Sequence, residues 1–152
     1  MILPYQSIKS LCEHHNLISP WHERTVAGGK TYGLSSAGYD MRVAQQHILH
    51  PGDFVLGSIM EHMNMPEGLM GIVHDKSSWA RMGIAVQNTV IEPGWRGYLT
   101  VELSNHSKQI ITIREGDPIC QIIFHTLLEH TEKPYRGKYQ DQKQGPQEAI
   151  HE

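Results

Sequence analysis

The stretch IEPGWRGYLTVELSN, residues 91–105, begins as a turn and continues as a strand. A proline–glycine pair supplies the turn, and polar and apolar residues alternate through the second half of the stretch. A period of two is typical of a strand with one buried face, here predicted to carry Leu99, Val101 and Leu103. Glu102 lies on the opposite face, where its carboxylate either meets water or is held in a site.

Short apolar runs of the same kind recur along most of the chain, separated by turns rich in Gly, Pro, Asn and Asp. They predict strands over residues 39–44, 47–50, 54–60, 69–74, 84–91, 98–105, 109–114 and 119–128. Strands at this spacing favour an all-β antiparallel sandwich or closed barrel. One short helix is predicted before them, over Gln6–His15 with Ser7 as its N-cap, because its apolar residues follow a helical period.

Length and composition indicate one soluble domain. A chain of 152 residues suits a single domain, residues 1–152, with a core of its own. No secretion signal or apolar run of about 18 residues is apparent, which argues against a membrane protein. Cys12 and Cys120 form no CxxC pair, as expected of a cytoplasmic protein. A net charge of −3 without a basic cluster argues against nucleic acid as a partner.

Two compositional features leave alternatives open. The chain has eleven histidines, which suggest metal binding, but no HExxH motif or paired cysteine ligands accompany them. Residues 133–152 are polar and contain Gly and Pro, a composition that predicts a mobile tail. Tyr135 and Tyr139 are unusual in a purely solvating tail, so a lid that orders over a ligand is the alternative.

Three further features combine residue types that can carry chemistry. KSSWAR, residues 76–81, places two hydroxyl groups between cations, which suits either a phosphate site or an ordinary solvated turn. In SSAGYDMRV, residues 35–43, small residues precede Asp40, which either bonds to its own turn or faces a site. Trp95 follows a turn, where a tryptophan lies at a core edge or at an interface.

Taken together and in chain order, SSAGYDMRV, KSSWARMGI, IEPGWRGYLTVELSN, GDPICQIIF and PYRGKYQDQKQGP resemble the dCTP deaminase branch of the deoxyuridine triphosphatase superfamily. The collinear match covers about three quarters of the chain, and about 30 N-terminal residues match less clearly. The resemblance implies a distorted, jelly-roll-like β-barrel that forms a homotrimer with active sites at the subunit boundaries. It also implies hydrolytic deamination of dCTP to dUTP and ammonia, with dTTP as a candidate inhibitor.

Within this resemblance, Glu102 matches the catalytic glutamate of the family. One carboxylate can deprotonate the water that attacks C4 of cytosine and then deliver protons to N3 and to the departing ammonia. Arg81 would orient Glu102 and balance its charge, and Ser77 would position the water or the amino group. Lys76 and Ser78, together with Ser77, would hold the triphosphate.

The resemblance also bears on metals. Zinc-dependent deaminases carry an HxE motif and a PCxxC motif around a metal-activated water. This chain has neither motif, so the implied reaction uses no zinc. The implied metal is Mg²⁺, bound with the triphosphate mainly through phosphate oxygens and water.

Other family positions would surround the nucleotide. Trp95 would pack near the sugar and disfavour a 2′-hydroxyl group, and Thr100 and Val101 would bind substrate beside the catalytic position. Residues 133–152 would form a mobile lid over the active site. Its residues on the phosphate-binding positions of the family are Tyr135, Lys138 and Gln142.

Glu92 departs from the family, which usually has an aspartate there. That aspartate binds the 3′-hydroxyl group and, in the triphosphatases, activates the water that attacks the α-phosphate. One extra methylene moves the carboxylate by about 1 Å, enough to matter in a positioned site, so a second, dUTP-hydrolysing step stays open. The loop before Glu92 is shorter than in longer family members, and its candidates for base contacts are Gln87, Asn88 and Thr89.

Several other functions remain as alternatives. A dUTP diphosphatase, or a bifunctional enzyme that releases dUMP, is suggested by the SAGYD motif that both branches share. Against the diphosphatase, the chain has a KYQDQ tail in place of the Gly-rich phosphate-binding motif of the triphosphatases. A non-catalytic, nucleotide-binding regulatory trimer and a histidine-based metal-storage or metal-sensing barrel are alternatives from other classes.

Overall fold

The computed structural model describes residues 1–151. The chain is mostly β-structure, with two short helices, α1 (Tyr5–His15) and α2 (Ser77–Ala80). The strands are β1 (Ile18–Ser19), β2 (Thr25–Ala27), β3 (Lys30–Leu34), β4 (Tyr39–Arg42), β5 (His47–Leu49), β6 (Phe54–Asn64), β7 (Leu69–Asp75), β8 (Ile84–Val86), β9 (Val90–Ile91), β10 (Arg96–Asn105), β11 (Ile111–Ile113) and β12 (Pro118–Thr126). The predicted all-β fold with one short N-terminal helix is confirmed, and α2 adds a single further turn.

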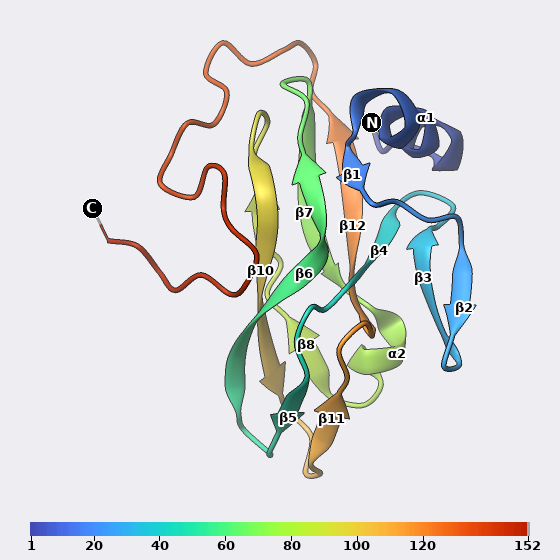
Figure 1. Ribbon diagram of the computed structural model, residues 1–152, viewed down its shortest axis with the longest axis vertical. Coiled ribbons are helices and arrows are strands. Elements are labelled where there is room, and N and C mark those ends of the chain that lie inside the picture. The colour runs from blue at the N-terminus through green and yellow to red at the C-terminus, as the bar shows by residue number, and fades with distance from the viewer. Residues whose placement is uncertain (152) are drawn as a thin grey trace.

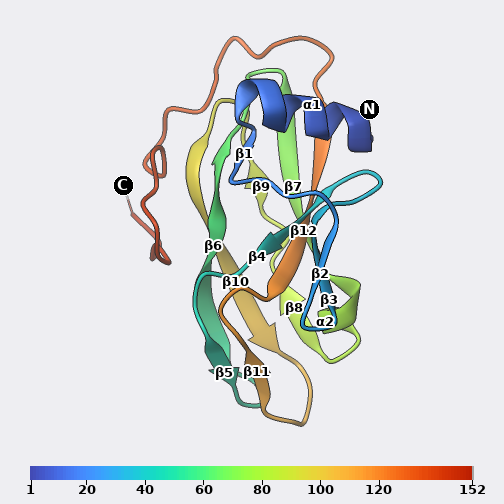
Figure 2. The same cartoon turned by 45° about the vertical axis from the view of Figure 1, so that its right-hand side comes forward.

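The strands form two antiparallel sheets and a two-stranded ribbon (Figure 1). One sheet has the strand order β1-β6-β10-β8 and the other the order β2-β3-β4-β12-β7-β9. The ribbon pairs β5 with β11 at the lower end of the view. Figure 2 shows the curled sheets on opposite sides of the molecule, in the distorted, jelly-roll-like arrangement that the resemblance implies.

One hydrophobic core lies between the sheets and extends under α1. Its largest fully buried side chains are Tyr39 and Phe124, and α1 contributes Ile8 and Cys12. Cys120 is buried as well, and both cysteines are free thiols. Within residues 1–151, no helix is both long enough and apolar enough to cross a membrane.

The N-terminal boundary of α1 differs from the prediction. The N-cap is Pro4, whose extended backbone directs its carbonyl to accept hydrogen bonds from the N–H groups of Ser7 and Ile8. The prediction of Ser7 as N-cap is therefore wrong, because Ser7 already lies in the first turn. Proline is tolerated at this end of a helix, where its missing N–H group has no partner to lose.

All eight predicted runs contain strands, but the three strands before β4, which are β1, β2 and β3, were not predicted. Residues 84–91 form two strands, β8 and β9, because the chain crosses at residues 87–89 from the sheet that contains β8 to the sheet that contains β9. The missed β2–β3 hairpin turns at Gly28 and Gly29, whose φ angles are +56° and +75°. Two successive left-handed residues suit a tight hairpin turn, and glycine adopts that conformation without steric cost.

An irregularity in the β6–β10 pair shapes the molecule around the site. Tyr98 pairs with His62 and Thr100 pairs with Ser58, so that one residue of β10 lies opposite three residues of β6 between these two pairs. Here β6 turns toward β4 and carries the fully buried Glu61 to Arg42, with a Nε–Oε1 distance of 2.8 Å. Burial raises the pKa of Glu61, and the hydrogen bonds from Arg42 oppose that shift.

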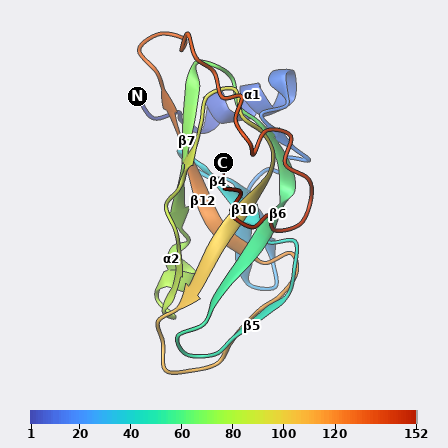
Figure 3. The same cartoon turned by 90° about the vertical axis from the view of Figure 1, so that its left-hand side faces the viewer.

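The last described part of the chain, residues 133–151, will be called the C-terminal segment. It lies alongside the β6–β10 face of the barrel (Figure 3). At Gly97 it forms a short parallel bridge with β10 through Gln142. A cavity remains between this segment and the strands.

Candidate active site

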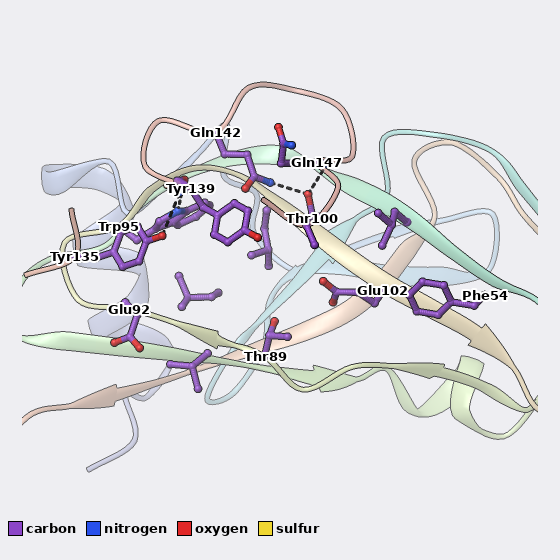
Figure 4. A pocket seen from close by; sticks show the side chains of 15 residues that line it. Phe54, Thr89, Glu92, Trp95, Thr100, Glu102, Tyr135, Tyr139, Gln142 and Gln147 are labelled. Atoms are coloured by element: carbon purple, nitrogen blue, oxygen red, sulfur yellow. Dashed lines mark hydrogen bonds between the residues drawn. The ribbon is translucent and has the colours of Figure 1, made fainter. Parts of the chain in front are cut away.

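The cavity has a volume of about 490 Å³ and is bounded by β6, β9, β10 and the C-terminal segment (Figure 4). Its wall combines apolar side chains with two carboxylates and several amide and hydroxyl groups. The predicted site residues that the structure brings together here are Glu92, Trp95, Thr100, Glu102, Tyr135 and Gln142.

Glu102 extends from β10 into this cavity rather than into open solvent. Its Oε2 atom is buried, and no hydrogen-bond partner for it is found within residues 1–151. Desolvation raises the pKa of the carboxyl group, because burial disfavours the charged form. Glu102 is therefore a partly desolvated carboxyl group that lines a cavity, and its burial favours the protonated form.

Leu99 was predicted to face the core, and the structure confirms this only in part, because the side chain packs against the core without being fully buried. The side chain is half-buried and lines the cavity next to Thr100. The irregular pairing between β6 and β10 at this point breaks the strict alternation, so that two consecutive residues contribute to one wall. Beyond the irregularity the alternation returns, and Val101 and Leu103 are buried as predicted.

The turn between β9 and β10 forms the other end of the cavity. Trp95 is 5% exposed, and its indole Nε1 donates a 2.7 Å hydrogen bond to the carbonyl oxygen of Tyr139 in the C-terminal segment. The Trp95 N–H donates to the carbonyl of Glu92, which closes the turn. The side chain of Glu92 is exposed along the cavity wall, so its longer carboxylate is available to a ligand.

The C-terminal segment covers the cavity through hydrogen bonds to β10. The Gln142 side-chain amide donates to the carbonyl of Tyr98 at 2.9 Å and to the hydroxyl of Thr100 at 2.6 Å. The backbone N–H of Gln147 donates to the same Thr100 hydroxyl at 2.9 Å. The Tyr135 hydroxyl accepts from the N–H of Tyr139, which closes a compact turn within the segment.

The KSSWAR residues lie outside the cavity of their own chain. Lys76 is half-buried and forms an ion pair with Asp40, with a Nζ–Oδ2 distance of 2.8 Å. Ser77, Ser78 and Arg81 are exposed on and just after α2. The structure therefore does not bring these residues to Glu102 within one chain.

Comparisons with known proteins decide the family. The sequence model described as dCTP deaminase-like matches residues 39–127. A dCTP deaminase of Gemmatimonas aurantiaca is 32% identical over 168 residues, covering 89% of this chain and 91% of the relative. A dCTP deaminase of Herpetosiphon aurantiacus is 31% identical with the same coverage. The chain belongs to the dCTP deaminase-like family.

Solved structures support the fold of this family member. EIAV dUTPase is similar with a TM-score of 0.57 and 24% identity, covering 68% of this chain and 87% of that one. A dUTPase from phage phi11 of S. aureus also has a TM-score of 0.57, with 17% identity over 80% of this chain and 93% of its own. The predicted dUTPase-like, jelly-roll-like barrel is thereby confirmed.

Two residues taken from the family pattern occupy positions that restrict their roles. Val101 is 1% exposed and packs in the core, so only its backbone is near the cavity face. Strand alternation turns the Val101 side chain away from Glu102, so substrate binding at Val101, which stays a prediction, would involve its backbone. Lys138 is exposed, with its Nζ 5.6 Å from the centre of the Tyr139 ring, and does not line the cavity.

Several cavity residues of this dCTP deaminase-like protein were not predicted. They are Phe54, Leu56, Val90, Ile91, Leu99, Tyr139, Gln147 and Ala149. Of the loop candidates for base contacts, Thr89 lines the cavity and Gln87 and Asn88 do not. The pairing of β6 with β10 indicates one of these residues, because Leu56 lies directly opposite Glu102 and so faces the same cavity.

The histidines do not converge on a metal site in the described structure. Within residues 1–151, no group of three or more His, Cys, Asp or Glu side chains is arranged to hold a metal ion.

Proposed function

We propose that this protein is a homotrimeric, cytoplasmic dCTP deaminase that hydrolyses dCTP to dUTP and ammonia, with Glu102 as general base and then general acid. The observation that supports this most directly is the Glu102 carboxyl group, which has one buried oxygen without a partner and lines a nucleotide-sized cavity. Family membership and relatives named dCTP deaminase support the same substrate.

Glu102 carries the proton transfers in this proposal. It takes a proton from a water molecule as the water oxygen bonds to C4 of cytosine, and it gives that proton to N3. It then takes the proton of the new hydroxyl group and delivers it to the amino group. The C4–N bond breaks, ammonia leaves and the C4 carbonyl of uracil forms. A raised pKa suits a carboxyl group that must act in both directions.

The cavity suggests one orientation for the nucleotide. The base would lie toward Glu102, and the sugar would lie toward Trp95 and Glu92 at the opposite end (Figure 4). Leu56 and Leu99 supply apolar surface for the faces of the ring. Tyr135 of the C-terminal segment would meet the phosphates, whereas a phosphate contact by Gln142 would require its side-chain amide to leave Tyr98 and Thr100.

Mg²⁺ bound with the triphosphate is compatible with these residues. Such an ion needs few protein ligands, because phosphate oxygens and water supply most of its coordination. Glu92, an exposed carboxylate on the cavity wall, would hold a water ligand of the ion. When bound, Mg²⁺ supplies charge neutralisation of the phosphates. One solved structure of the phage phi11 dUTPase is described with a structural Mg(II) ion.

A second copy of the chain would complete the site. Ser77, Ser78 and Arg81 are exposed and lie away from their own cavity, so we propose that they act in the cavity of a neighbouring subunit. Phe54 and Val90 on the cavity wall are 58% and 47% exposed, and apolar surface of this kind favours burial against another subunit.

Product analysis tests the proposed reaction. Purified protein is incubated with dCTP and Mg²⁺, and ammonia, dUTP, dUMP and diphosphate are resolved. Ammonia and dUTP are expected in equal amounts. Glu102→Gln is expected to lose deamination while still binding nucleotide, and the exposed Glu115→Gln serves as its matched control. Absence of ammonia, or full activity in Glu102→Gln, would contradict the proposal.

Subunit mixing tests the shared site. Glu102→Gln and Arg81→Ala chains, each inactive alone, are co-expressed. In a randomly mixed trimer, about a quarter of the sites would combine an intact Glu102 from one chain with an intact Arg81 from another. Recovery of about that fraction of wild-type activity is expected. If both residues acted within one chain, mixing would restore nothing.

Hydrolysis of dUTP is a second candidate activity, because the Glu92 carboxylate is exposed to the cavity at the position of the water-activating aspartate. Supplying dUTP and measuring dUMP and diphosphate distinguishes the two enzymes. Diphosphate release from dUTP without ammonia release from dCTP would favour the dUTP diphosphatase, and both products would indicate a bifunctional enzyme.

A further inference from the structure

Thr100 lies in the cavity between the Glu102 carboxyl group and the C-terminal segment. Its side chain enters the cavity from β10, two residues before Glu102 (Figure 4). Its hydroxyl oxygen accepts one hydrogen bond from the Gln142 amide at 2.6 Å and another from the backbone N–H of Gln147 at 2.9 Å. Both donors belong to the C-terminal segment.

These two bonds restrict what the hydroxyl group can do next. A threonine hydroxyl has two acceptor lone pairs and one proton to donate. The C-terminal segment occupies both acceptor positions, and within residues 1–151 the hydroxyl proton is donated to no acceptor. With the segment closed, Thr100 can therefore interact with a ligand only as a donor.

We propose that Thr100 is a specificity-determining residue that closure of the C-terminal segment converts into a hydrogen-bond donor for the C2 carbonyl oxygen of the pyrimidine. This inference rests on the proposed function, because it takes the orientation of the base from the role of Glu102. It deepens that function by naming a contact between the protein and the base and by linking the contact to closure.

The assignment to the C2 carbonyl follows from the order of groups along the cavity. Glu102 would face C4, and Trp95 would face the sugar, with Thr100 between them on β10 (Figure 4). Side chains two residues apart on a strand are about 6.6 Å apart. Going from C4 of the ring toward the sugar, the acceptor outside the ring is the oxygen on C2. That oxygen is an acceptor in cytosine and in uracil, so Thr100 would select pyrimidines without distinguishing substrate from product.

The first test measures the link to the C-terminal segment without nucleotide. Thr100→Val keeps the shape of the side chain and removes the oxygen, so amide exchange at Gln147 is expected to be about tenfold faster, as for the loss of one hydrogen bond. Thr100→Ser keeps the hydroxyl group and should keep slow exchange. Thr112→Val, at an exposed threonine on β11, is the matched control. Unchanged exchange in Thr100→Val would overturn the link.

The second test measures the donor role by calorimetric binding in the Glu102→Gln background, so that turnover does not interfere. The probes are dCTP and 2-thio-dCTP, whose sulfur is a weak acceptor. The sulfur analogue is expected to bind about tenfold more weakly when Thr100 is present and equally well when Thr100 is replaced by Val. An equal sulfur penalty in both proteins, or no binding of either probe, overturns the inference.

The two proposals fail in distinguishable ways. Absence of ammonia release by the wild-type protein contradicts the deaminase activity, whereas the exchange and binding measurements do not depend on turnover. If the wild-type protein deaminates dCTP and Thr100→Val shows neither faster exchange nor loss of the sulfur penalty, the inference fails while the function stands.

Discussion

Gly97 is the position where a single added carbon should open the cavity. An alanine Cβ at Gly97 would lie 2.7 Å from the backbone nitrogen of Gln142 and 2.9 Å from its carbonyl oxygen. Real Cβ atoms do not approach backbone atoms this closely, and neither atom can rotate away. Gly97→Ala should therefore displace the C-terminal segment from β10.

The size of the effect follows from the bonds that would be lost. Gln142 forms three hydrogen bonds to β10: two with the backbone of Tyr98, at 3.0 and 2.9 Å, and one with the Thr100 hydroxyl at 2.6 Å. At about 1 kcal/mol each, their loss shifts the closed–open equilibrium of the segment by about 3 kcal/mol, on the order of 100-fold. Backbone strain at Gly97, where φ is +143°, burdens open and closed states alike and so cancels from this equilibrium.

Limited trypsin digestion measures the displacement, because Arg136, Lys138 and Lys143 lie in the segment. Cleavage that requires opening follows the population of the open state, so Gly97→Ala should be cut up to about 100-fold faster. Gly116→Ala is the matched control: its φ is +83°, but an added Cβ has no neighbour within 4 Å. Equal cleavage of Gly97→Ala and wild-type protein, or equal acceleration in both variants, would refute the reasoning.

Three further results are expected. Because desolvation raises the pKa of Glu102 in the single chain, the acidic limb of the kcat/KM profile for dCTP should lie above the ordinary range of a glutamate if one chain forms the site, and closer to that range if Arg81 of another subunit completes it; a limb below that range would argue against this base. Arg42→Met should lower the free energy of unfolding by about 3–5 kcal/mol in urea denaturation, because Glu61 loses its buried partner, and adding Glu61→Gln should restore most of it. Burial already raises the pKa of Glu61 in the folded state, so the deficit of Arg42→Met should grow as pH rises through that pKa and shrink in acid; a pH-independent deficit would contradict this. Glu92→Asp should increase diphosphate release from dUTP relative to wild type, measured by chromatography, and no increase would show that carboxylate length is not what limits this step.

The fold could be predicted where the chain alternates cleanly. In β10, Val101 and Leu103 are buried as the period of two requires, and the long apolar runs of β6, β7 and β12 are strands. The N-terminal strands were missed because β2 presents exposed residues and lacks a buried face of its own. The paired glycines at 28 and 29 were an available hairpin signal, and their positive φ angles explain why both are glycine.

The candidate site was less predictable than the fold, for a physical reason. Alternation assigned Leu99 wholly to the core, but the β6–β10 register shifts between Tyr98 and Thr100, where three residues of β6 lie opposite one residue of β10. No local pattern in β10 records that event. The contribution of Gln147 likewise depends on a tertiary hydrogen bond to Thr100, which composition cannot indicate.

The resemblance assigned one site to residues that a single chain does not bring together. It grouped Arg81 and Ser77 with Glu102, whereas the chain holds the first two outside the cavity that contains the third. The site is formed either by one chain or by two, and the two cases predict different pKa values for Glu102. If the single chain were the functional unit, the desolvated carboxyl group of Glu102 would have no cation among the described residues of the cavity wall, and its pKa would stay raised.

If Arg81 of another subunit approaches instead, its positive charge lowers the pKa of Glu102 again and favours the carboxylate that must accept the first proton. The same approach would cover Phe54 and Val90, which a single chain leaves exposed. Subunit assembly would then also set the protonation state of Glu102, since the Arg81 side chain that completes the site is the one that lowers the pKa of Glu102. In the proposed assembly, the Glu102 oxygen that has no partner within residues 1–151 of one chain would find its partner in Arg81 of a second copy of the chain.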